Sequence, residues 1–530
     1  MSDGPRGRGG RRWDSYTVAG GLLFLLFAAT QWSPHVRRHE ALYLLGSRRV
    51  VDPGFLAGDM SWSAVPPTSF LFDHALAPLW GLTGDFGIVV LGRLLTWALL
   101  AWSLARLFRI LRLPPWSAVA GAFLWLLWDQ TLVTCGALLE GFQPKSFAYP
   151  LAFFSLAFAV EGRVVRAGLA AGLATAFHII VGGWCCLALF LTVLGQRRLF
   201  SLRQVGTFLA ATLPFTVPLV LAVGLFHAGG VSSDERAAMD AIYVTFAQPH
   251  CTDPTSFMQA DRWVRVAAVL PLAVLLLLLW PRERRAGTVV AGFVATLALF
   301  HGLGMLASPL EQYWYLKVYP FKPANGIVPL LFFVLVLGFA GGRPERRWDR
   351  AVWVVAIVVL VWLVDDRDVL KKDLPDLPGD VAERFQREPP SRYHQLLPES
   401  KRMLYAWIRK ETPRDSLFVT PYVADFWTYA ERPQLASMRH PPHDVGLIEW
   451  RRRLGELNRS RPFEERGFEI TKELNRNAGR LSARELAGMR DRYGATHYLA
   501  LAERDDLADH ELFAAGRFHV YGLAGLPAGE

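Results

Sequence analysis

Two carboxylates in the first long loop could do chemistry. The stretch VDPGFLAGDM places Asp52 before a Pro-Gly turn and Asp59 directly after a glycine, so both sit on irregular backbone near apolar segments. A carboxylate in such a position suits a general base or a ligand of a divalent metal. Each one taken alone also has a structural explanation, because Asp52 could cap the turn and Asp59 could be solvated.

Lysines are the second informative residue type. Only three of the 30 Lys and Arg residues at positions 1–365 are lysines, namely Lys145, Lys317 and Lys322. Lys145 shares the stretch GALLEGFQPKSFAYP with Glu140, and the other two share the aromatic-rich stretch SPLEQYWYLKVYPFKPANG with Glu311. Each stretch also has a structural explanation. Glu140 and Lys145 could simply form an ion pair, and the aromatic residues around Lys317 could form a belt at a membrane interface.

Four further polar residues lie within or beside apolar segments: Arg93, Asp129, His178 and His301. Charges inside a membrane are costly, which makes them candidates for function. Arg93 could also extend to lipid headgroups, and His178 could bond to a carbonyl at a helix break. These alternatives do not explain why lysines, histidines and acids collect on one side, so the pattern indicates a site there.

The composition requires that these residues be positioned by membrane helices. Of 530 residues, 52% are hydrophobic and 20% are charged, and the apolar residues come in long runs such as 266–280 (VAAVLPLAVLLLLLW). This excludes an ordinary soluble enzyme, a disordered chain and a fibrous one. About eleven crossings are predicted: Tyr16–Trp32, Phe86–Ala105, Trp116–Val133, Phe147–Val160, Ala167–His178, Val181–Leu194, Val205–Phe226, Trp263–Trp280, Thr288–Leu306, Ile327–Phe339 and Ala351–Val364.

The charge distribution predicts the topology. Residues 1–365 carry the whole net charge of +10, and the remaining residues carry 27 charges of each sign. With a cytoplasmic N-terminus, alternate connections are rich in Arg, as the positive-inside rule requires, so the excess is not read as nucleic-acid binding. The two lysine-bearing stretches and a long first loop, Ser33–Gly84, then lie on the outer side. Cys135 and Cys251 also fall there, where a disulfide between them is feasible.

The C-terminal residues predict an α/β domain on the outer side. Residues 366–397 read as a linker and 398–530 as the domain, after a transmembrane domain over 1–365. Helices are expected at Ser400–Glu411, at Ile448–Leu457 and from a capping box of Ser482 and Glu485 to Tyr493. Strands are expected at Ser416–Thr420, Thr496–Leu501 and Arg517–Leu523.

Several catalytic signatures are absent from the sequence. It contains no GxxxxGK[ST] loop, so ATP-driven transport lacks support. It also contains no HExxH, CxxC or GxSxG motif, and therefore no support for zinc-protease, thiol-redox or α/β-hydrolase chemistry.

This architecture resembles the GT-C class of membrane glycosyltransferases, in which an acidic first outer loop precedes further spans and a soluble outward domain. His39-Glu40, Asp52 and Asp59 occupy the place of the acidic motif, without a DxD or DE pair. The stretches LLEGFQPKSFAYP, AGLATAFHIIVGGW and WIRKETPRDSLFVTPYVADFWTYAERP are similar to an uncharacterised bacterial membrane protein family of that shape. The resemblance implies a bacterial inner-membrane protein with its C-terminal domain in the periplasm or outside the cell.

The resemblance also implies a reaction and a set of roles. A sugar would pass from a polyprenyl-phosphate donor to a glycan, lipid or protein acceptor at the outer face, without nucleic acid. Asp59, Glu40 or Asp52 would supply the base, with a divalent metal compatible but not required. The donor phosphate would be bound by Lys145, Lys317, Lys322 and Arg93, and supporting roles would fall to Glu140, His178, His301 and Glu311.

Two other classes of function remain open. A transporter, or a protein that handles lipid or glycan without chemistry, would fit the break near His178 and Gly182–Gly183. A catalytically inactive assembly scaffold is the third. A transporter should place polar residues near the middle of the membrane and open to both sides, whereas these residues collect outward.

Overall fold

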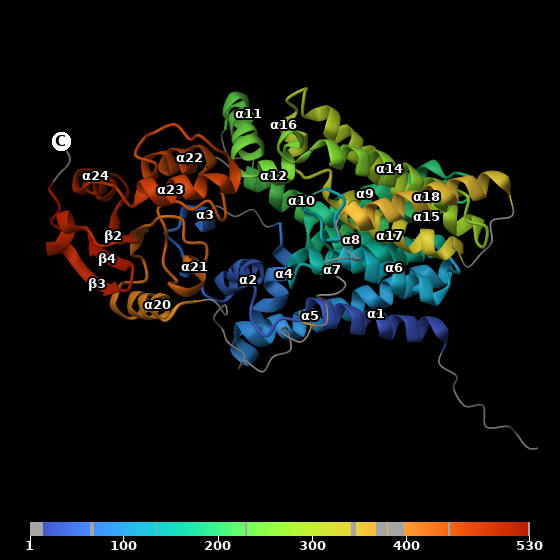
Figure 1. Cartoon of the computed structure of the whole chain (residues 1–530), viewed down its shortest axis with the longest axis horizontal. Coiled ribbons are helices and arrows are strands. Elements are labelled where there is room, and N and C mark those ends of the chain that lie inside the picture. The colour runs from blue at the N-terminus through green and yellow to red at the C-terminus, as the bar shows by residue number, and fades with distance from the viewer. Residues whose placement is uncertain are drawn as a thin grey trace, which may run out of the picture.

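The chain forms a bundle of apolar helices joined to a small α/β region. The computed structural model describes residues 14–63, 68–133, 135–227, 231–340, 346–366, 379, 397–443 and 446–527. The long helices form the right-hand part of Figure 1, and the sheet with its helices forms the left-hand end. The predicted linker, residues 366–397, lies outside the described residues except for 366, 379 and 397.

All eleven predicted crossings coincide with helices. These helices are α1(Ser15–Gln31), α5(Trp80–Ile110), α6(Pro115–Leu127), α7(Pro144–Val160), α8(Val164–Phe177), α9(Ile179–Gly195), α10(Leu202–His227), α14(Ala260–Leu278), α15(Arg284–Ala307), α17(Lys322–Ala340) and α18(Arg347–Asp366). Among the described residues, four stretches are long and apolar enough to cross a membrane, at Phe70–Ile110, Leu202–Leu225, Arg284–Ala307 and Lys322–Ala340. The chain is therefore a helical membrane protein, and the count of eleven crossings stays a prediction.

The exposed and buried helices of this bundle differ as expected for a bundle in lipid. In α17, 89% of the apolar window is buried, whereas in α10 the figure is 17%. The outer face of α10 exposes large apolar side chains such as Val220 and Leu225. Gly121 of α6 lies so close to α17 that an added Cβ would be 2.7 Å from the Cα of Val334. Small residues that let helices approach closely are typical of membrane interiors.

The predicted break at His178 is confirmed. Helix α8 ends at Phe177 and α9 begins at Ile179, with His178 in an extended conformation between them. The ring Nδ1 of His178 accepts a hydrogen bond from the backbone N–H of Val181 at 3.1 Å, which caps α9. Gly182 allows α9 to approach α8 closely after this break, because a Cβ at position 182 would be 2.2 Å from the backbone of Ala174.

Short helices cover one end of the bundle. They are α2(Arg38–Val51), α3(Met60–Ser63), α4(Phe70–Leu76), the 3₁₀ turn η1(Ala77–Leu79), α11(Ser233–Ala241), the π-helical turn η2(Ile242–Ala247), α12(Pro249–Thr252), α13(Pro254–Phe257) and α16(Tyr313–Leu316). A disulfide joins Cys135, in the loop before α7, to Cys251 of α12. These segments therefore form a connected layer between the bundle and the C-terminal region.

The C-terminal region is a four-stranded sheet with helices. Its elements are α20(Glu399–Glu411), β1(Leu417–Val419), α21(Phe426–Tyr429), α22(Gly446–Leu457), η4(Gly467–Glu469), α23(Ile470–Ala478), α24(Ala483–Tyr493), β2(Ala495–Ala500), η5(Asp505–His510), β3(Glu511–Ala515) and β4(Phe518–Gly522). The strand order is β1-β2-β4-β3, with β1 parallel to β2 and the other pairs antiparallel. The three predicted helices and three predicted strands are present, and α21, η4, α23, η5 and β3 are additional.

The predicted helix end signals at α24 are confirmed in detail. Ser482 and Glu485 form the capping box, and Gly494 ends the helix with φ of +72°. Strand β2 then alternates its side chains between the two faces of the sheet: Leu499 packs with Phe418, whereas Tyr498 packs with Leu486 of α24.

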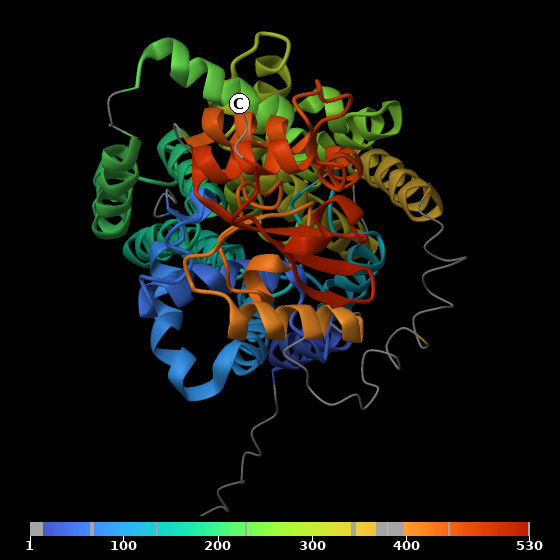
Figure 2. The same ribbon diagram turned by 90° about the vertical axis from the view of Figure 1, so that its left-hand side faces the viewer.

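The C-terminal region is held against the bundle by buried contacts. Its core extends into the short-helix layer, where Tyr243 and Phe246 of η2 pack with Trp450 of α22. Three ion pairs between described residues cross the same boundary: Arg48 with Glu431 at 2.7 Å, Arg466 with Asp253 at 2.9 Å, and Arg414 with Asp52 at 3.1 Å. Figure 2 shows the sheet and α20 in front of the ends of the bundle helices.

Candidate functional site at the junction

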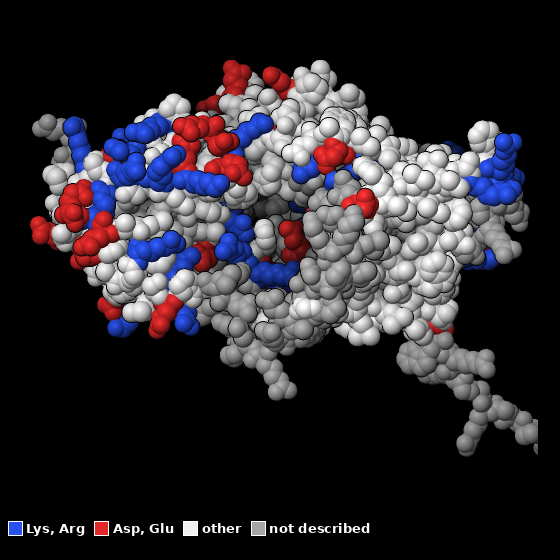
Figure 3. Space-filling view, in the orientation of Figure 1, with Lys and Arg blue, Asp and Glu red and all other residues white. Residues whose placement is uncertain are grey.

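A cavity of about 460 Å³ lies where the bundle, the short-helix layer and the C-terminal region meet. We call it the junction cavity. Figure 3 shows a hollow at this boundary, with Lys, Arg, Asp and Glu at its rim. The polar and aromatic residues that line the cavity include His39, Tyr43, Trp62, Asp73, Glu140, Gln143, Lys145, His178, Tyr243, His250, Tyr319, Lys322, Arg439, His440, His443 and Phe468. Four of the residues singled out from the sequence, Glu140, Lys145, His178 and Lys322, are thus brought together.

Lys145 is positioned by the first turn of α7. The side chain is almost fully buried, and its Nζ lies 2.5 Å from the carboxylate of Glu140. Burial raises the pKa of Glu140, but the Lys145 ammonium outweighs burial and lowers this pKa to about 2. Glu140 therefore stays ionised and is a poor proton acceptor. The alternative explanation from the sequence, an ion pair between these two residues, is confirmed.

Lys322 presents a second cation, at the start of α17. Its Nζ is 5.0 Å from the centre of the Tyr319 ring. No ion pair to Lys322 occurs among the residues that the structure describes. The Tyr319 hydroxyl shares a hydrogen bond of 2.7 Å with that of Tyr243, which fixes both rings in the wall. The cavity therefore offers one ammonium that a bound anion could pair with.

The segment Arg439–His443 supplies the wall on the side of the C-terminal region. Arg439 reaches His39 of α2, with Nη2 3.4 Å from Nδ1. His440 stacks on Trp62 at 4.6 Å between ring centres, and His443 lies 5.3 Å from Tyr243. Burial lowers the pKa of His440 to about 3, and burial also lowers that of His39, so both rings are neutral at pH 7. The lysine and arginine side chains that line the cavity are Lys145, Lys322 and Arg439.

Asp73 is the second carboxylate of the junction cavity. It belongs to α4, is half-buried, and has no hydrogen bond or ion pair to its carboxylate among the described residues. Its Oδ1 occupies the space beside Gly46, where an added Cβ would be 2.5 Å away. A carboxylate that lines a cavity and lacks a protein partner remains able to accept a proton.

Two of the predicted catalytic acids lie outside the junction cavity and are fully buried. Glu40 pairs with Arg93 at 2.7 and 2.5 Å, and it also accepts hydrogen bonds from the backbone N–H groups of Arg37 and Phe142. Asp59 accepts hydrogen bonds from Trp427 Nε1 at 2.5 Å and from the N–H of Gln434 at 2.8 Å. Burial outweighs these hydrogen bonds and raises the pKa of Asp59 to about 6. The oxygens of both acids are directed to internal donors, so Glu40 connects the first loop to α5 and to the loop before α7, and Asp59 connects it to the C-terminal region.

The other predicted residues are also separate from the cavity. Asp52 pairs with Arg414 at 3.1 Å, and Lys317 pairs with Asp240. Glu311 is exposed in the loop before α16. His301 is buried in α15, with its ring 5.1 Å from that of Phe321. Their predicted roles in binding or catalysis gain no geometric support.

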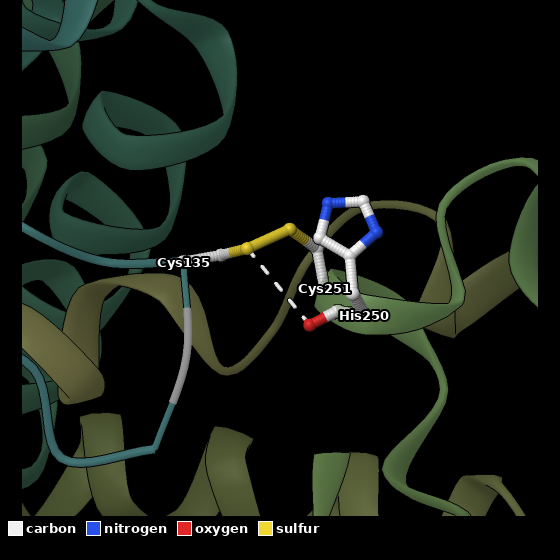
Figure 4. Close-up of side chains that lie close together, drawn as sticks. All are labelled: Cys135, His250 and Cys251. Atoms are coloured by element: carbon white, nitrogen blue, oxygen red, sulfur yellow. Dashed lines mark hydrogen bonds between the residues drawn. A yellow bond between two sulfur atoms is a disulfide. The ribbon is translucent and has the colours of Figure 1, made fainter. Parts of the chain in front are cut away.

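The disulfide lies in the cavity wall beside His250. The ligand atoms of Cys135, His250 and Cys251 lie within 4.8 Å of one another, a grouping compatible with a metal ion. Figure 4 shows, however, that the two sulfurs are bonded to each other, so neither is a thiolate ligand. The Sγ of Cys135 is 3.9 Å from the carbonyl oxygen of His250. These residues fix the loop before α7 onto α12.

Sequence reasoning missed Asp73, Arg439 and His440 as members of the site. Asp73 was one of several acids in the first loop, and no spacing distinguished it from Asp52 or Asp59. The stretch RHPPH at 439–443 does carry a signal, because two histidines and an arginine flank a rigid Pro-Pro pair. The sequence placed this stretch in a separate domain. Its position beside Lys145 and Lys322 becomes evident only in the folded structure.

Comparison with known proteins gives two matches. A family model described as a domain of unknown function, DUF6798, matches residues 400–457, from α20 to α22. Among solved structures, the chain is similar to ArnT from Cupriavidus metallidurans, whose crystal structure is described as bound to undecaprenyl phosphate. That match has a TM-score of 0.36 and 15% identity, and it covers 97% of this chain and 98% of the other. No curated protein sequence matches the chain.

Proposed function

We propose that this protein is a membrane glycosyltransferase that moves a sugar from a polyprenyl-phosphate donor to an acceptor at the outer face of the membrane. The observation that carries the proposal is the junction cavity, which is large enough for a sugar phosphate and combines the basic side chains Lys145, Lys322 and Arg439 with aromatic walls. Lys322, which makes no ion pair among the described residues, pairs with the donor phosphate. Arg439 adds positive charge, whereas the charge of Lys145 is balanced by Glu140.

The reaction is a single displacement at the anomeric carbon. The acceptor hydroxyl oxygen forms a bond to that carbon, the bond from carbon to phosphate oxygen breaks, and polyprenyl phosphate leaves with the electron pair. Asp73 takes the hydroxyl proton, in place of the buried Asp59 and Glu40. Lysine and arginine stabilise the negative charge that develops on the leaving phosphate. Inversion at the anomeric carbon follows from the single displacement.

The aromatic residues of the cavity position the sugar. Trp62, held by its stack on His440, and Tyr43 supply flat apolar faces of the kind on which sugar rings pack. His39 is neutral and its Nδ1 faces Arg439, so its Nε2–H is left as a donor to a sugar hydroxyl. A divalent metal is not required by this arrangement, since the lysines supply the charge.

The membrane placement of the cavity supports a lipid-borne donor. Figure 3 shows a mostly uncharged band over the bundle, charged side chains over the C-terminal region, and Lys and Arg again at the opposite end. Arg-rich connections at that opposite end are typical of the cytoplasmic side. A disulfide in the cavity wall is typical of an oxidising compartment. Both observations favour a cavity that faces the periplasm or the cell exterior in a bacterial inner membrane.

Native mass spectrometry of the detergent-purified protein tests the proposal. Wild type is expected to retain a polyprenyl-phosphate sugar, Asp73→Asn to enrich it because turnover stops, and Lys322→Gln to lose most of it. Lys410→Gln and Asp234→Asn remove a charge of the same sign outside the cavity and should match wild type. Absence of any phosphate lipid from wild type, or an equal amount in all variants, would refute the proposal.

A binding role without chemistry is the second candidate. It is favoured by one observation: two of the three acids expected to act as the base, Asp59 and Glu40, have every described contact inside the junction. A protein that only handles lipid or glycan would retain the phosphate lipid in wild type and show the same amount after Asp73→Asn. Loss with Lys322→Gln alone would therefore support this alternative.

A further inference from the structure

A second cavity, in the C-terminal region, carries its own positive charge. Its volume is about 200 Å³. Its lining includes Arg38 of α2, Lys401 of α20, Asp425, Asn475 and Arg517. We call it the C-terminal cavity. Three cations face one carboxylate there, an excess of two positive charges, and the reaction described above assigns this cavity no role.

The single carboxylate of the C-terminal cavity is already neutralised. Asp425 lies 2.7 and 2.9 Å from the Nζ of Lys401 and accepts a hydrogen bond of 2.8 Å from Tyr405. Arg38 and Arg517 make no ion pair among the residues that the structure describes. Two guanidinium groups from distant parts of the chain therefore converge on one small cavity without an acid to pair with.

The two cavities adjoin one another. Arg38 of the C-terminal cavity is followed in α2 by His39 of the junction cavity. The charge of Arg439, which lines the junction cavity, also acts on the hydroxyl of Tyr422, which lines the C-terminal cavity. A molecule whose charged end occupies the C-terminal cavity can therefore extend past this pair toward the sugar site.

We infer that the C-terminal cavity binds a phosphate monoester group of the sugar acceptor. A phosphate monoester carries about −1.5 to −2 charges at neutral pH, which matches the excess of two positive charges better than a single carboxylate does. Guanidinium groups bind phosphate oxygens through paired N–H donors. The inference rests on the proposed function, because it assigns the acceptor to the glycosyl transfer in the junction cavity.

Binding of inorganic phosphate to the full chain in detergent tests this assignment. Calorimetric titration at constant ionic strength should give two classes of site in wild type. Combined Arg38→Gln and Arg517→Gln should weaken one class at least tenfold, and Lys322→Gln should weaken the other. Both arginines are exposed, so neither substitution removes buried packing. Arg38→Lys with Arg517→Lys should retain weaker binding, since charge remains but the paired donors do not.

Arg402→Gln is the matched control. This exposed arginine is the neighbour of Lys401 in α20 but does not line the C-terminal cavity. It should leave both sites unchanged, and an equal loss with Arg402→Gln would overturn the inference. A site lost only with Lys322→Gln, and none sensitive to Arg38 or Arg517, overturns the inference and leaves the proposed function standing. A site that is sensitive to Arg38 and Arg517, with none that is sensitive to Lys322, overturns the proposed function and therefore also the acceptor role of the C-terminal cavity.

A second arm identifies the source of the phosphate. Phosphatidic acid in nanodiscs presents the same phosphate monoester on a lipid, and phosphatidylcholine nanodiscs serve as the reference. If the arginine double variant abolishes the preference for phosphatidic acid, the acceptor is lipid-borne. If inorganic phosphate binds and phosphatidic acid shows no such preference, the phosphate belongs to a soluble acceptor. Binding of neither probe would overturn the inference.

Discussion

The buried boundary around Glu40 and Asp59 and the junction cavity both include residues of the first loop, but their charged side chains are paired to different extents. At the boundary, Glu40 and Asp59 direct their oxygens to internal donors. In the cavity, Asp73 and Lys322 line open space without an ion pair among the described residues. Charged side chains whose partners are all internal therefore hold the two regions together. Charged side chains that line open space without an ion pair are available to bind a ligand.

Breaking the Glu40–Arg93 pair should have the largest effect on stability. Glu40→Gln leaves the guanidinium of Arg93 fully buried without a counter-charge. Removing one partner of a buried pair typically costs about 3–5 kcal/mol. Denaturant unfolding in detergent should show this loss. Arg106→Gln, which breaks a half-exposed pair with Glu161, should cost less than about 1 kcal/mol, and an equal loss in both variants would contradict the assignment.

The pH dependence of stability should report on Asp59. Its pKa in the folded protein is about 6, above the ordinary value of 3.8. The folded state therefore binds the proton more tightly, and the stabilisation present below pH 4 is lost as the pH rises to about 6. The shift corresponds to about 3 kcal/mol at most. Asp59→Asn should remove this slope between pH 4 and 6, whereas an unchanged slope would show that another group is responsible.

The sequence predicted the elements of this fold better than it predicted the site. Long apolar runs located the eleven helices, because each run forms a helix on its own. Local signals also located the break at His178 and the cap at Ser482. The site required contacts between distant segments: nothing local shows that Arg93 is neutralised by Glu40, or that Arg439 lies near His39. Burial and pairing, which separate Asp73 from Asp59, are set only by the packing of the C-terminal region on the first loop.

Lys322→Met should increase the stability of the ligand-free protein, in contrast to Glu40→Gln. A half-buried ammonium that makes no ion pair costs free energy, so an apolar side chain of similar length should stabilise the ligand-free protein by up to about 1 kcal/mol. Loss of phosphate-lipid binding should accompany the gain, as is usual for residues kept for function. Thermal unfolding and lipid retention, measured on one preparation, would check both effects. If Lys322→Met is less stable than wild type, Lys322 contributes to the stability of the protein, as the internally paired residues do.

Gly46→Ala should have the smallest effect on stability and still impair the proposed transfer. Alanine favours a helix over glycine by about 0.5–1 kcal/mol, but its Cβ at position 46 would be 2.5 Å from Oδ1 of Asp73. The carboxylate must therefore move, and the two effects on stability nearly cancel. Gly21→Ala in α1 is the control, because an added Cβ there meets nothing within 4 Å. If Asp73 accepts the proton, sugar transfer should fall at least tenfold in Gly46→Ala and stay at the wild-type rate in Gly21→Ala. Equal transfer rates in both variants would show that Asp73 is not the base. A catalytic carboxylate must lie within hydrogen-bond distance of the reacting hydroxyl, and a methyl group at position 46 would displace it.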